Sequence, residues 1–376
     1  MTQELPGRSL EEAWGTDGVG HLRVLGRAPR APGSTEEREA REYCAAVLRN
    51  LGFDVSTEAF SYSAFPGRYG TPVAGAIAAV SVLVTIWLAV IEGAVVAASI
   101  AFGAGLVVLV LFVWSMLGDA VLEVPWLRSD GLNLIARRGD APPRVWLVAH
   151  VDSKSQPLPT GVRIAGFAIL ATSVVLTGVV LALTLGTGSS RTILWMTCAV
   201  LAAVGGRAVA ASVVRNESPG AVDNASGVAA VLAAAALVDP TTSVGVLIPS
   251  AEELGLAGAR AWVRAHAGER AIVVNCDGVD DQGELILMYT RTRPGLIVDA
   301  VERAAGEVRV LRMPPGMLLD SVAFAGAGWS AATLSHGSMK TLSRVHTRRD
   351  TLDVLTGSQV DPMGWVLART AEALAR

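Results

Sequence analysis

Histidines and carboxylates recur in this chain directly after short apolar runs. The clearest case is His150, with Asp152 close behind it, which follows the run Val145–Ala149. A short run rich in β-forming residues predicts a buried strand. Open α/β sheets carry their chemistry in the loops at the carboxyl ends of strands. The sequence therefore places His150 and Asp152 at a candidate active site.

A pair of adjacent carboxylates, Glu252 and Glu253, leaves a second predicted strand, Val244–Ile248. Two neighbouring carboxylates at the end of a buried strand repel each other unless a cation or a proton lies between them. One of the pair therefore suits a metal ligand, and the other suits a proton carrier. The alternative interpretation is that the pair is only the solvated start of a helix.

Three further residues stand at comparable positions. Asp223 lies in the loop Gly220–Gly227 just before a predicted helix, where a carboxylate can offer both oxygens at once and so bridge two metal ions. Asp277 follows a short predicted strand, and His346 lies in a loop before the last predicted helix. The shared placement of these residues at strand ends or before helices is stronger evidence than any single motif.

The remaining histidines carry weaker signals. His336 precedes the loop that contains His346, so it could line a substrate pocket, and the alternative is that it has no role. His21 and His266 lie in polar segments and are expected at the surface.

The elements that must position these side chains follow from periodicity and turn signals. A helix is expected from Ser34 to Leu51, because the segment begins with a Ser-x-x-Glu capping box and ends at Gly52. Further helices are expected after Gly227, after Gly258, from Asp320 and from about Val360. The predicted strands are 53–60, 132–136, 145–149, 244–248, 272–275, 285–289 and 308–311, with a turn at 139–142 between the second and third, and a further apolar run is 331–334. The expected fold class is α/β, a mixed central sheet with flanking helices, interrupted by insertions.

Two long apolar insertions interrupt this pattern. Hydrophobic residues make up 51% of the chain and charged residues 17%, with a mean hydropathy of +0.45, which is too apolar for an ordinary soluble protein. The insertions, 71–117 and 164–214, are each long enough for two spans of ~20 residues, with turns at Glu92-Gly93 and at 186–191. They predict four transmembrane helices in two hairpins. The alternative is that they are buried core helices of a soluble domain.

The distribution of basic residues predicts the side of the membrane. Both hairpins must return the chain to one sheet, so the segments that flank them lie on one side. That side carries Arg68, Arg128, Lys154, Arg163, Arg207 and Arg215, whereas the turns offer Glu92 and Arg191. The positive-inside rule then places the catalytic domain of a multi-pass membrane protein in the cytoplasm. The predicted division is an N-terminal segment 1–33, a catalytic domain built from 34–70, 118–163 and 215–376, and hairpins at 71–117 and 164–214.

Charge and cysteine usage exclude other classes. With a net charge of -3 and a pI near 6.0, the chain has no basic field of the kind that nucleic acids need, so no such partner is expected. The cysteines, Cys44, Cys198 and Cys276, form neither a CxxC metal site nor a disulfide framework, and Cys276 is expected in the core. The N-terminus has no apolar h-region, so no cleavable signal peptide is expected. The sequence does not indicate an oligomeric state.

Taken in order, the motifs resemble those of the zinc aminopeptidase family with two co-catalytic metals. They are AHVDS, GAVDNASG, AEELGLAG, NCDG, LLDSVAF and VHTRRDTLD. This family includes bacterial leucyl aminopeptidases, glutamate carboxypeptidase II and the glutaminyl cyclases. The resemblance covers the chain from about Ser34 to Arg376 without the hairpins, and it implies a phosphorylase/hydrolase-like zinc exopeptidase fold. The set of motifs is specific, although no single motif is.

Carried over to this chain, the resemblance implies two zinc ions. His150 and Asp277 would bind one ion, Glu253 and His346 would bind the other, and Asp223 would bridge them. Glu252 would be the general base, and Asp152 would orient His150. Imidazole and carboxylate groups suit zinc, and two ions ~3.5–4 Å apart can activate a shared water. The departures, a Pro-Ser-Ala run before the Glu pair and Leu319 before Asp320, remove no ligand.

The implied function is that of a membrane-anchored aminopeptidase, which hydrolyses the amide bond next to the free amino group of a peptide. Two alternatives stay open: glutaminyl cyclisation with a single zinc, and a catalytically silent membrane scaffold or receptor. His150 precedes the second insertion by about a dozen residues and Asp223 follows it by under ten, so the metals should lie within ~30–40 Å of the lipid headgroups. This favours a membrane-associated substrate, either a hydrophobic peptide or an aminoacylated lipid. The alternative is that the hairpins only anchor the chain.

Overall fold

The computed structural model describes residues 17–139, 141–187, 191–314 and 316–376. Within these residues the chain forms two compact units. The first unit comprises residues 17–62, 128–155 and 216–376, and the second comprises 63–127 and 156–215, apart from the residues left undescribed. The chain therefore passes from the first unit to the second twice and returns twice.

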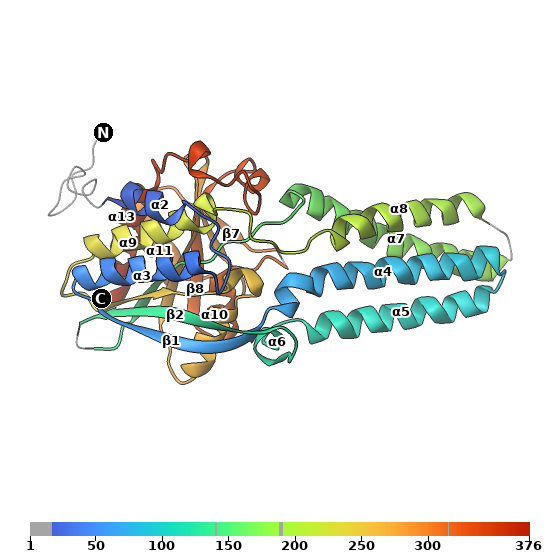
Figure 1. The fold of residues 1–376 in the computed structure, drawn as a ribbon, viewed down its shortest axis with the longest axis horizontal. Helices are drawn as coiled ribbons and strands as arrows, with labels where there is room; N and C mark the ends of the chain where they lie inside the picture. Colours follow the sequence, from blue (N-terminus) through green and yellow to red (C-terminus); the bar gives the residue numbers. More distant parts are fainter. Residues whose placement is uncertain (1–16, 140, 188–190, 315) are drawn as a thin grey trace. The chain divides into compact units, whose positions relative to one another are not determined.

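The first unit is built on one sheet, in which the described residues form eight strands in the order β1-β2-β4-β3-β5-β8-β6-β7 (Figure 1). The strands are β1 (Asp54–Ser63), β2 (Arg128–Arg138), β3 (Val145–Val148), β4 (Val244–Ile248), β5 (Ile272–Val279), β6 (Glu284–Tyr289), β7 (Arg309–Arg312) and β8 (Ser330–Gly337). β3 is parallel to β4 and β5, and β5 is parallel to β8. β2 and β6 run antiparallel to their neighbours β4 and β8. The predicted mixed sheet is confirmed.

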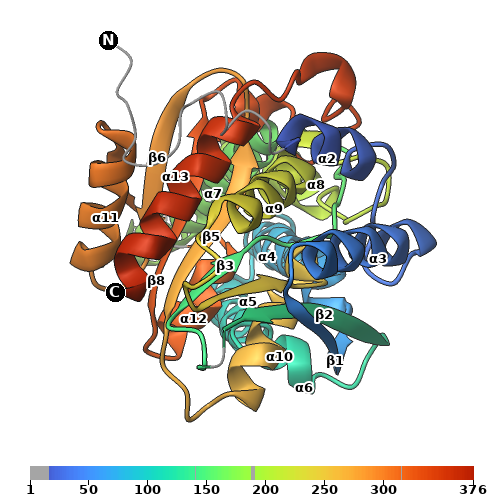
Figure 2. The ribbon, with the colours of Figure 1, turned by 90° about the vertical axis from the view of Figure 1, so that its left-hand side faces the viewer.

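Helices cover both faces of this sheet, and β3 shows why. Val145 and Leu147 point into one hydrophobic cluster, whereas Trp146 and Val148 point into the other, as expected for a strand that is buried on both sides. The first cluster includes α2 (Gly18–Leu25), α3 (Thr35–Asn50), α9 (Gly227–Leu237), α11 (Gly295–Ala305) and α13 (Val360–Ala375). The second includes α10 (Ala257–Ala265) and α12 (Asp320–Gly326). Figure 2 shows α9 and α13 on one face and α10 and α12 on the other.

Local signals located most of these elements. The backbone N–H of Glu37 donates to Ser34 Oγ at 3.1 Å, so α3 begins at its predicted cap, although the Glu37 carboxylate accepts from Gly33 N instead of closing the box. Three α-helices of the described residues were not predicted: α2, α11 and the short α6 (Ala120–Glu123). The turn predicted at 139–142 falls partly on residue 140, which lies outside the described residues.

The second unit contains four helices that are long and apolar enough to cross a membrane, counted over the described residues. They are Pro66–Ile91, which includes α4 (Thr71–Ile86), then α5 (Val95–Ser115), α7 (Thr160–Thr187) and α8 (Thr192–Ala210). The first pair is separated at Glu92-Gly93, as predicted. The second pair is separated near 186–191, of which residues 188–190 lie outside the described part. By length and composition, the four predicted spans are present.

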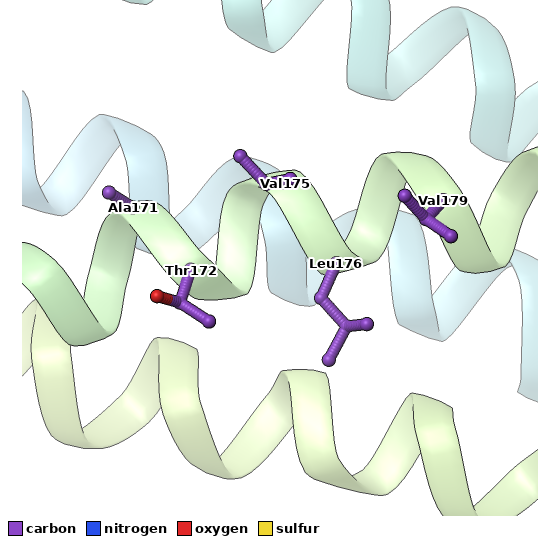
Figure 3. A pocket seen from close by; sticks show the side chains of 5 residues that line it. All are labelled: Ala171, Thr172, Val175, Leu176 and Val179. Carbon is purple, nitrogen blue, oxygen red and sulfur yellow. The ribbon is translucent and has the colours of Figure 1, made fainter.

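These helices pack through small residues and turn large apolar side chains outward. A Cβ added to Gly205 of α8 would come within 2.6 Å of the Leu170 backbone in α7, and one at Gly75 of α4 would meet Val209 of α8 at 2.4 Å. Such close contact through small residues is typical of helix pairs in membranes. A shallow apolar hollow on α7 is lined by Ala171, Thr172, Val175, Leu176 and Val179 (Figure 3).

Candidate metal centre

All seven predicted site residues belong to the first unit, and they gather at one edge of its sheet. β3, β4, β5 and β8 are parallel, so their carboxyl ends lie at the same edge. His150 and Asp152 follow β3, Glu252 and Glu253 follow β4, Asp277 lies near the end of β5, and His346 lies in the loop after β8. Asp223 comes from the turn before α9. The topology therefore brings together residues that are far apart in sequence.

Asp223 lies at the centre of the group, between two histidines. Its Oδ1 is 3.3 Å from His150 Nε2, and its Oδ2 is 2.8 Å from His346 Nε2. His150 Nε2 is also 3.7 Å from Asp277 Oδ2, and His346 Nε2 is 3.5 Å from Glu253 Oε2. Each histidine thus contacts a different oxygen of Asp223, with Asp277 beside His150 and Glu253 beside His346.

Two clusters of three residues present ligand atoms within 4.8 Å of one another in the described chain. One is Asp223, Glu253 and His346, and the other is His150, Glu252 and Asp277. Glu252 therefore lies close enough to be a ligand as well as a proton carrier, since its Oε2 is 4.0 Å from His150 Nε2. Geometry alone leaves both roles open to Glu252.

Asp152 contacts more than the histidine beside it. His150 Nδ1 lies 3.1 Å from the main-chain oxygen of Asp152 and 3.6 Å from its carboxylate. The two carboxylate oxygens accept hydrogen bonds from the backbone N–H groups of Glu252 and Glu253, both at 3.1 Å. Asp152 therefore ties the loop after β3 to the loop after β4, a contact that no motif predicted.

The site concentrates negative charge in a buried space. Five carboxylates, those of Asp152, Glu252, Glu253, Asp277 and Asp320, are buried, and the side chain of Asp223 is 11% exposed. Burial, followed by the neighbouring carboxylates, raises the pKa of Glu252 well above its ordinary value and that of Asp320 to about 8. So many carboxylates are stable together only where protons or cations balance them.

The histidines respond to the same field. Burial lowers the pKa of His150, but Glu252, Asp152 and Asp223 outweigh it and raise that pKa well above its usual value. Burial opposes ionisation of Asp223, but the imidazoles of His150 and His346 beside its carboxylate hold its pKa well below the ordinary range. The arrangement therefore favours positive charge between the carboxylates.

The donor set fits a zinc ion. His150 Nε2 and Glu253 Oε1 are buried and have no hydrogen-bond partner among the described residues. Unpartnered buried polar atoms are rare and costly, and these two belong to the two clusters of imidazole and carboxylate ligands. Nitrogen and oxygen ligands of this kind are those that zinc takes in catalytic sites.

Two residues at the site were missed by sequence reasoning. Lys154 forms an ion pair with Glu253. Asp350 accepts hydrogen bonds from the backbone N–H groups of Val222, at 2.7 Å, and Asp223, at 3.1 Å, and burial raises its pKa to about 6. Lys154 directly follows the motif AHVDS and Asp350 lies within VHTRRDTLD, which was the available signal, but both side chains act on segments distant in sequence.

The backbone is strained around the site. Ala251, which precedes the Glu pair, has φ of 57°, and Leu256 and His346 have φ of 61° and 63°. Residues with a Cβ rarely adopt this left-handed region, and such residues cluster at functional sites. The strain therefore supports a functional role for this edge of the sheet.

The other histidines do not join the cluster. His336 is half-buried, and its Nδ1 lies 2.6 Å from the main-chain oxygen of Asp280. The expectation that His21 and His266 lie at the surface is wrong, because both are half-buried: His21 contacts the Tyr43 hydroxyl at 2.7 Å, and His266 stacks on Trp262. Cys276 is fully buried, as expected.

Comparison with known proteins bears on the fold and the family. Residues 133–371 match Peptidase family M28. An aminopeptidase from Aneurinibacillus sp. strain AM-1 superposes with a TM-score of 0.57 at 15% identity, with 97% of this chain and 95% of that chain covered. BSAP, a zinc aminopeptidase from Bacillus subtilis, gives 0.55 at 14% identity, with 98% and 95% covered. Fimbriiglobus ruber glutaminyl cyclase gives 0.55 at 15% identity, with 96% and 94% covered. At these identities the likeness shows the fold, and no curated protein matches the sequence.

Proposed function

The chain belongs to Peptidase family M28, and we propose that it is a membrane-anchored di-zinc aminopeptidase. It would hydrolyse the amide bond next to the free N-terminal amine of a peptide. Family membership supports peptide hydrolysis, and the likeness to aminopeptidases supports the position of the bond. The two ligand clusters support a pair of ions, and the role of each residue is carried over from the family resemblance.

The observation that carries the proposal is the position of Asp223. Its two oxygens face different histidines, at 3.3 and 2.8 Å, as a ligand shared by two ions would. His150 and Asp277 would complete one site, and Glu253 and His346 would complete the other. When bound, the zinc ions supply Lewis acidity, which acidifies water and stabilises the negative charge that develops on the scissile carbonyl oxygen.

The protein groups then have separate tasks. Glu252 accepts a proton from the attacking water and returns it to the leaving amine, because its carboxylate is buried and lies 4.0 Å from His150 Nε2. Asp152 holds the Glu252-Glu253 backbone through its two hydrogen bonds and faces the Nδ1 side of His150. Burial of these groups keeps bulk water away from the reacting atoms.

Metal analysis of the purified full-length chain, combined with two substrates, tests this proposal. About two zinc ions per chain and hydrolysis of an aminoacyl peptide are expected of a co-catalytic pair. One ion together with cyclisation of a peptide that has N-terminal glutamine would establish the glutaminyl-cyclase alternative instead. Absence of both bound metal and turnover would support the alternative of a catalytically silent scaffold or receptor.

The cytoplasmic placement of the catalytic domain is proposed from the basic residues that flank the insertions. Single cysteines read by a membrane-impermeant thiol reagent test it, because the native cysteines Cys44, Cys198 and Cys276 are buried. Glu92→Cys, at the exposed first turn, should react from outside intact cells, whereas Ala267→Cys, exposed in the first unit, should not. The opposite labelling pattern would place the catalytic domain outside.

Other positions suit this experiment less well. Gly93 has φ of 63°, so a side chain there is strained, and residue 189 lies outside the described residues. Ser153 is fully buried, so a cysteine there would stay unlabelled on either side of the membrane.

We also propose that the substrate is membrane-associated, a hydrophobic peptide in preference to an aminoacylated lipid. The short tethers between the ligand residues and the second insertion support this, because they limit how far the site can lie from the headgroups. The comparison of kcat/KM for a soluble aminoacyl peptide and for the same peptide with a hydrophobic tail, both with enzyme in lipid nanodiscs, tests it. A preference for the tailed peptide is expected from its raised local concentration. Equal kcat/KM values for the two peptides would support the alternative that the hairpins only anchor the chain.

A further inference from the structure

Arg30 lies in the loop between α2 and α3, before the region that matches the family, and it is only 2% exposed. Its guanidinium group donates hydrogen bonds to five main-chain carbonyls, including Val151 O at 2.8 Å, Pro219 O at 2.6 Å and Gly220 O at 3.2 Å. Within the described part of the chain no carboxylate forms an ion pair with it. This buried cation therefore acts on backbone, and it joins two separate segments.

The two segments carry metal-ligand candidates. Val151 lies between His150 and Asp152, whereas Pro219 and Gly220 shortly precede Asp223. A planar guanidinium with donors in a fixed fork can hold several carbonyls at a set spacing, which a single ammonium nitrogen cannot. One side chain thus spans the loop that carries His150 and the loop that carries Asp223.

Ser153 reinforces the same junction. Its Oγ accepts from Arg30 N at 2.9 Å and donates to Ser218 O at 3.0 Å, and its own N–H donates to Arg30 O at 3.0 Å. Beside it, Glu217 N donates to Ser155 Oγ at 2.9 Å. All of these residues belong to the first unit.

The position of the junction in the chain explains why it is needed. The chain leaves the first unit after Ser155 and returns at Asn216, and it runs through α7 and α8 in between. The packed helices α7 and α8 lie between these two ends, so the main chain does not join the ligand loops directly. Contacts across the ends of the insertion, such as those of Arg30 and Ser153, therefore act directly on the spacing between the two ligand loops.

We infer that Arg30, with Ser153, forms a clasp that fixes the spacing between the loops carrying His150 and Asp223, and thereby sets the metal affinity of the site. Arg30 is a positioning residue in this role, because it contacts neither the candidate ligand side chains nor the reacting atoms. The inference rests on the proposed metal centre. It extends that proposal to a residue outside the matched region 133–371.

The test is the zinc affinity of the full-length chain in nanodiscs, measured by competition with a chelator. Arg30→Met should weaken zinc binding ~10–100-fold, as does loss of groups that orient metal ligands elsewhere. Arg30→Lys retains the charge but lacks the forked guanidinium, so its zinc binding should remain as weak as that of Arg30→Met. Recovery of wild-type affinity in Arg30→Lys would mean that charge alone matters, and it would overturn the clasp.

Arg138 provides a matched control. It is also a buried arginine that donates to main-chain carbonyls, among them Val238 O at 2.6 Å and Asp239 O at 3.4 Å, but it contacts no ligand loop. Arg138→Met should lower thermal stability and leave zinc affinity at the wild-type value. An equal loss of affinity in both methionine variants would reduce Arg30 to a general stability residue and overturn the inference.

Ser153→Ala keeps the test decisive if Arg30→Met does not fold. It removes the bond to Ser218 O and the acceptor for Arg30 N, so its zinc affinity should fall while the guanidinium contacts remain. Wild-type affinity in Ser153→Ala or in a folded Arg30→Met would contradict the clasp. Failure of the wild-type chain itself to bind zinc would instead contradict the proposed function.

Discussion

The two units distribute polar and apolar side chains in opposite ways. In the first unit the interior holds charge, with Glu252 6% exposed, Glu253 5% exposed and Asp320 fully buried. In the second unit the outside is apolar, with Ile193 81% exposed and Val107 58% exposed. Each arrangement would be costly in water alone, because buried carboxylates need counter-charge and exposed apolar surface needs an apolar surrounding. The comparison shows that the first unit needs counter-charge for its buried carboxylates, whereas the exposed side chains of the second unit need an apolar surrounding.

The largest expected effect concerns the buried carboxylates. Glu252→Gln should lower turnover ~10²–10⁴-fold, the usual contribution of a general base, while zinc stays bound. Glu253→Ala should instead lose zinc, because the removed carboxylate faces His346 at 3.5 Å and belongs to the ligand cluster. Zinc content and aminoacyl-peptide hydrolysis are measured on the same preparations.

This pair of variants also separates the two roles that geometry leaves open to Glu252. Loss of zinc in Glu252→Gln would make Glu252 a ligand of the cluster with His150 and Asp277. Near wild-type hydrolysis in that variant would contradict the general-base assignment altogether.

The next prediction concerns the exposed apolar side chains of the second unit. Val107 lies near the middle of α5 and is 58% exposed, and Leu296 at the start of α11 is 68% exposed. Val107→Lys should cost ~2.5–3.5 kcal/mol if its side chain meets lipid, so the fraction of chain recovered as inserted protein should fall. Leu296→Lys, a surface change in water, should stay within ~0.5 kcal/mol of the parent. Equal recovery of inserted protein for both lysine variants would contradict the expectation that lipid surrounds α5.

Much of the fold could be predicted because its signals are local. β4 matches the predicted strand 244–248, and the cap at Ser34 and the turn at Glu92-Gly93 lie where the residue types place them. Apolar runs, caps and breaks act within a few residues, so a single sequence displays them. The helices α2 and α11 were not predicted, and in the structure neither Asp17 nor Pro294 at their N-terminal ends forms a side-chain cap.

The same distinction between local and long-range signals applies to the candidate site. Residues at strand ends, such as His150 and Glu253, could be predicted from motifs. Arg30 and Asp350 could not, because each acts on backbone far away in sequence, at Val151 and at Val222. Contacts of this kind depend on the assembled tertiary structure, and no local pattern of residue types encodes them.

A smaller effect concerns how the second unit packs. A Cβ at Gly205 would come within 2.6 Å of Leu170 N and 2.9 Å of Leu170 Cα, whereas one at Gly103 in α5 would meet nothing within 4 Å. Gly205→Ala should therefore destabilise the helix pair by ~1–3 kcal/mol, the usual cost of overpacking. Gly103→Ala should leave stability unchanged or slightly raised, because alanine favours the helix. Thermal unfolding in one detergent compares them, and equal melting temperatures would show that α7 and α8 do not approach this closely.

The smallest expected effect lies in the strained backbone of the first unit. Ala251 has φ of 57° and ψ of 35°, a left-handed conformation that costs a residue with a Cβ ~1 kcal/mol and glycine almost nothing. Ala251 and Ala229, in the middle of α9, are both fully buried, so Ala→Gly removes a buried methyl group worth ~0.8 kcal/mol at either position. At Ala251 the relieved strain should offset that loss and keep the free energy of unfolding within ~0.5 kcal/mol of the parent, whereas Ala229→Gly should lower it by ~1–2 kcal/mol. A clearly smaller loss at Ala251, read from denaturant midpoints, would show that conformation decides the difference. An equal loss in both would mean that Ala251 is not held in the left-handed region beside Glu252.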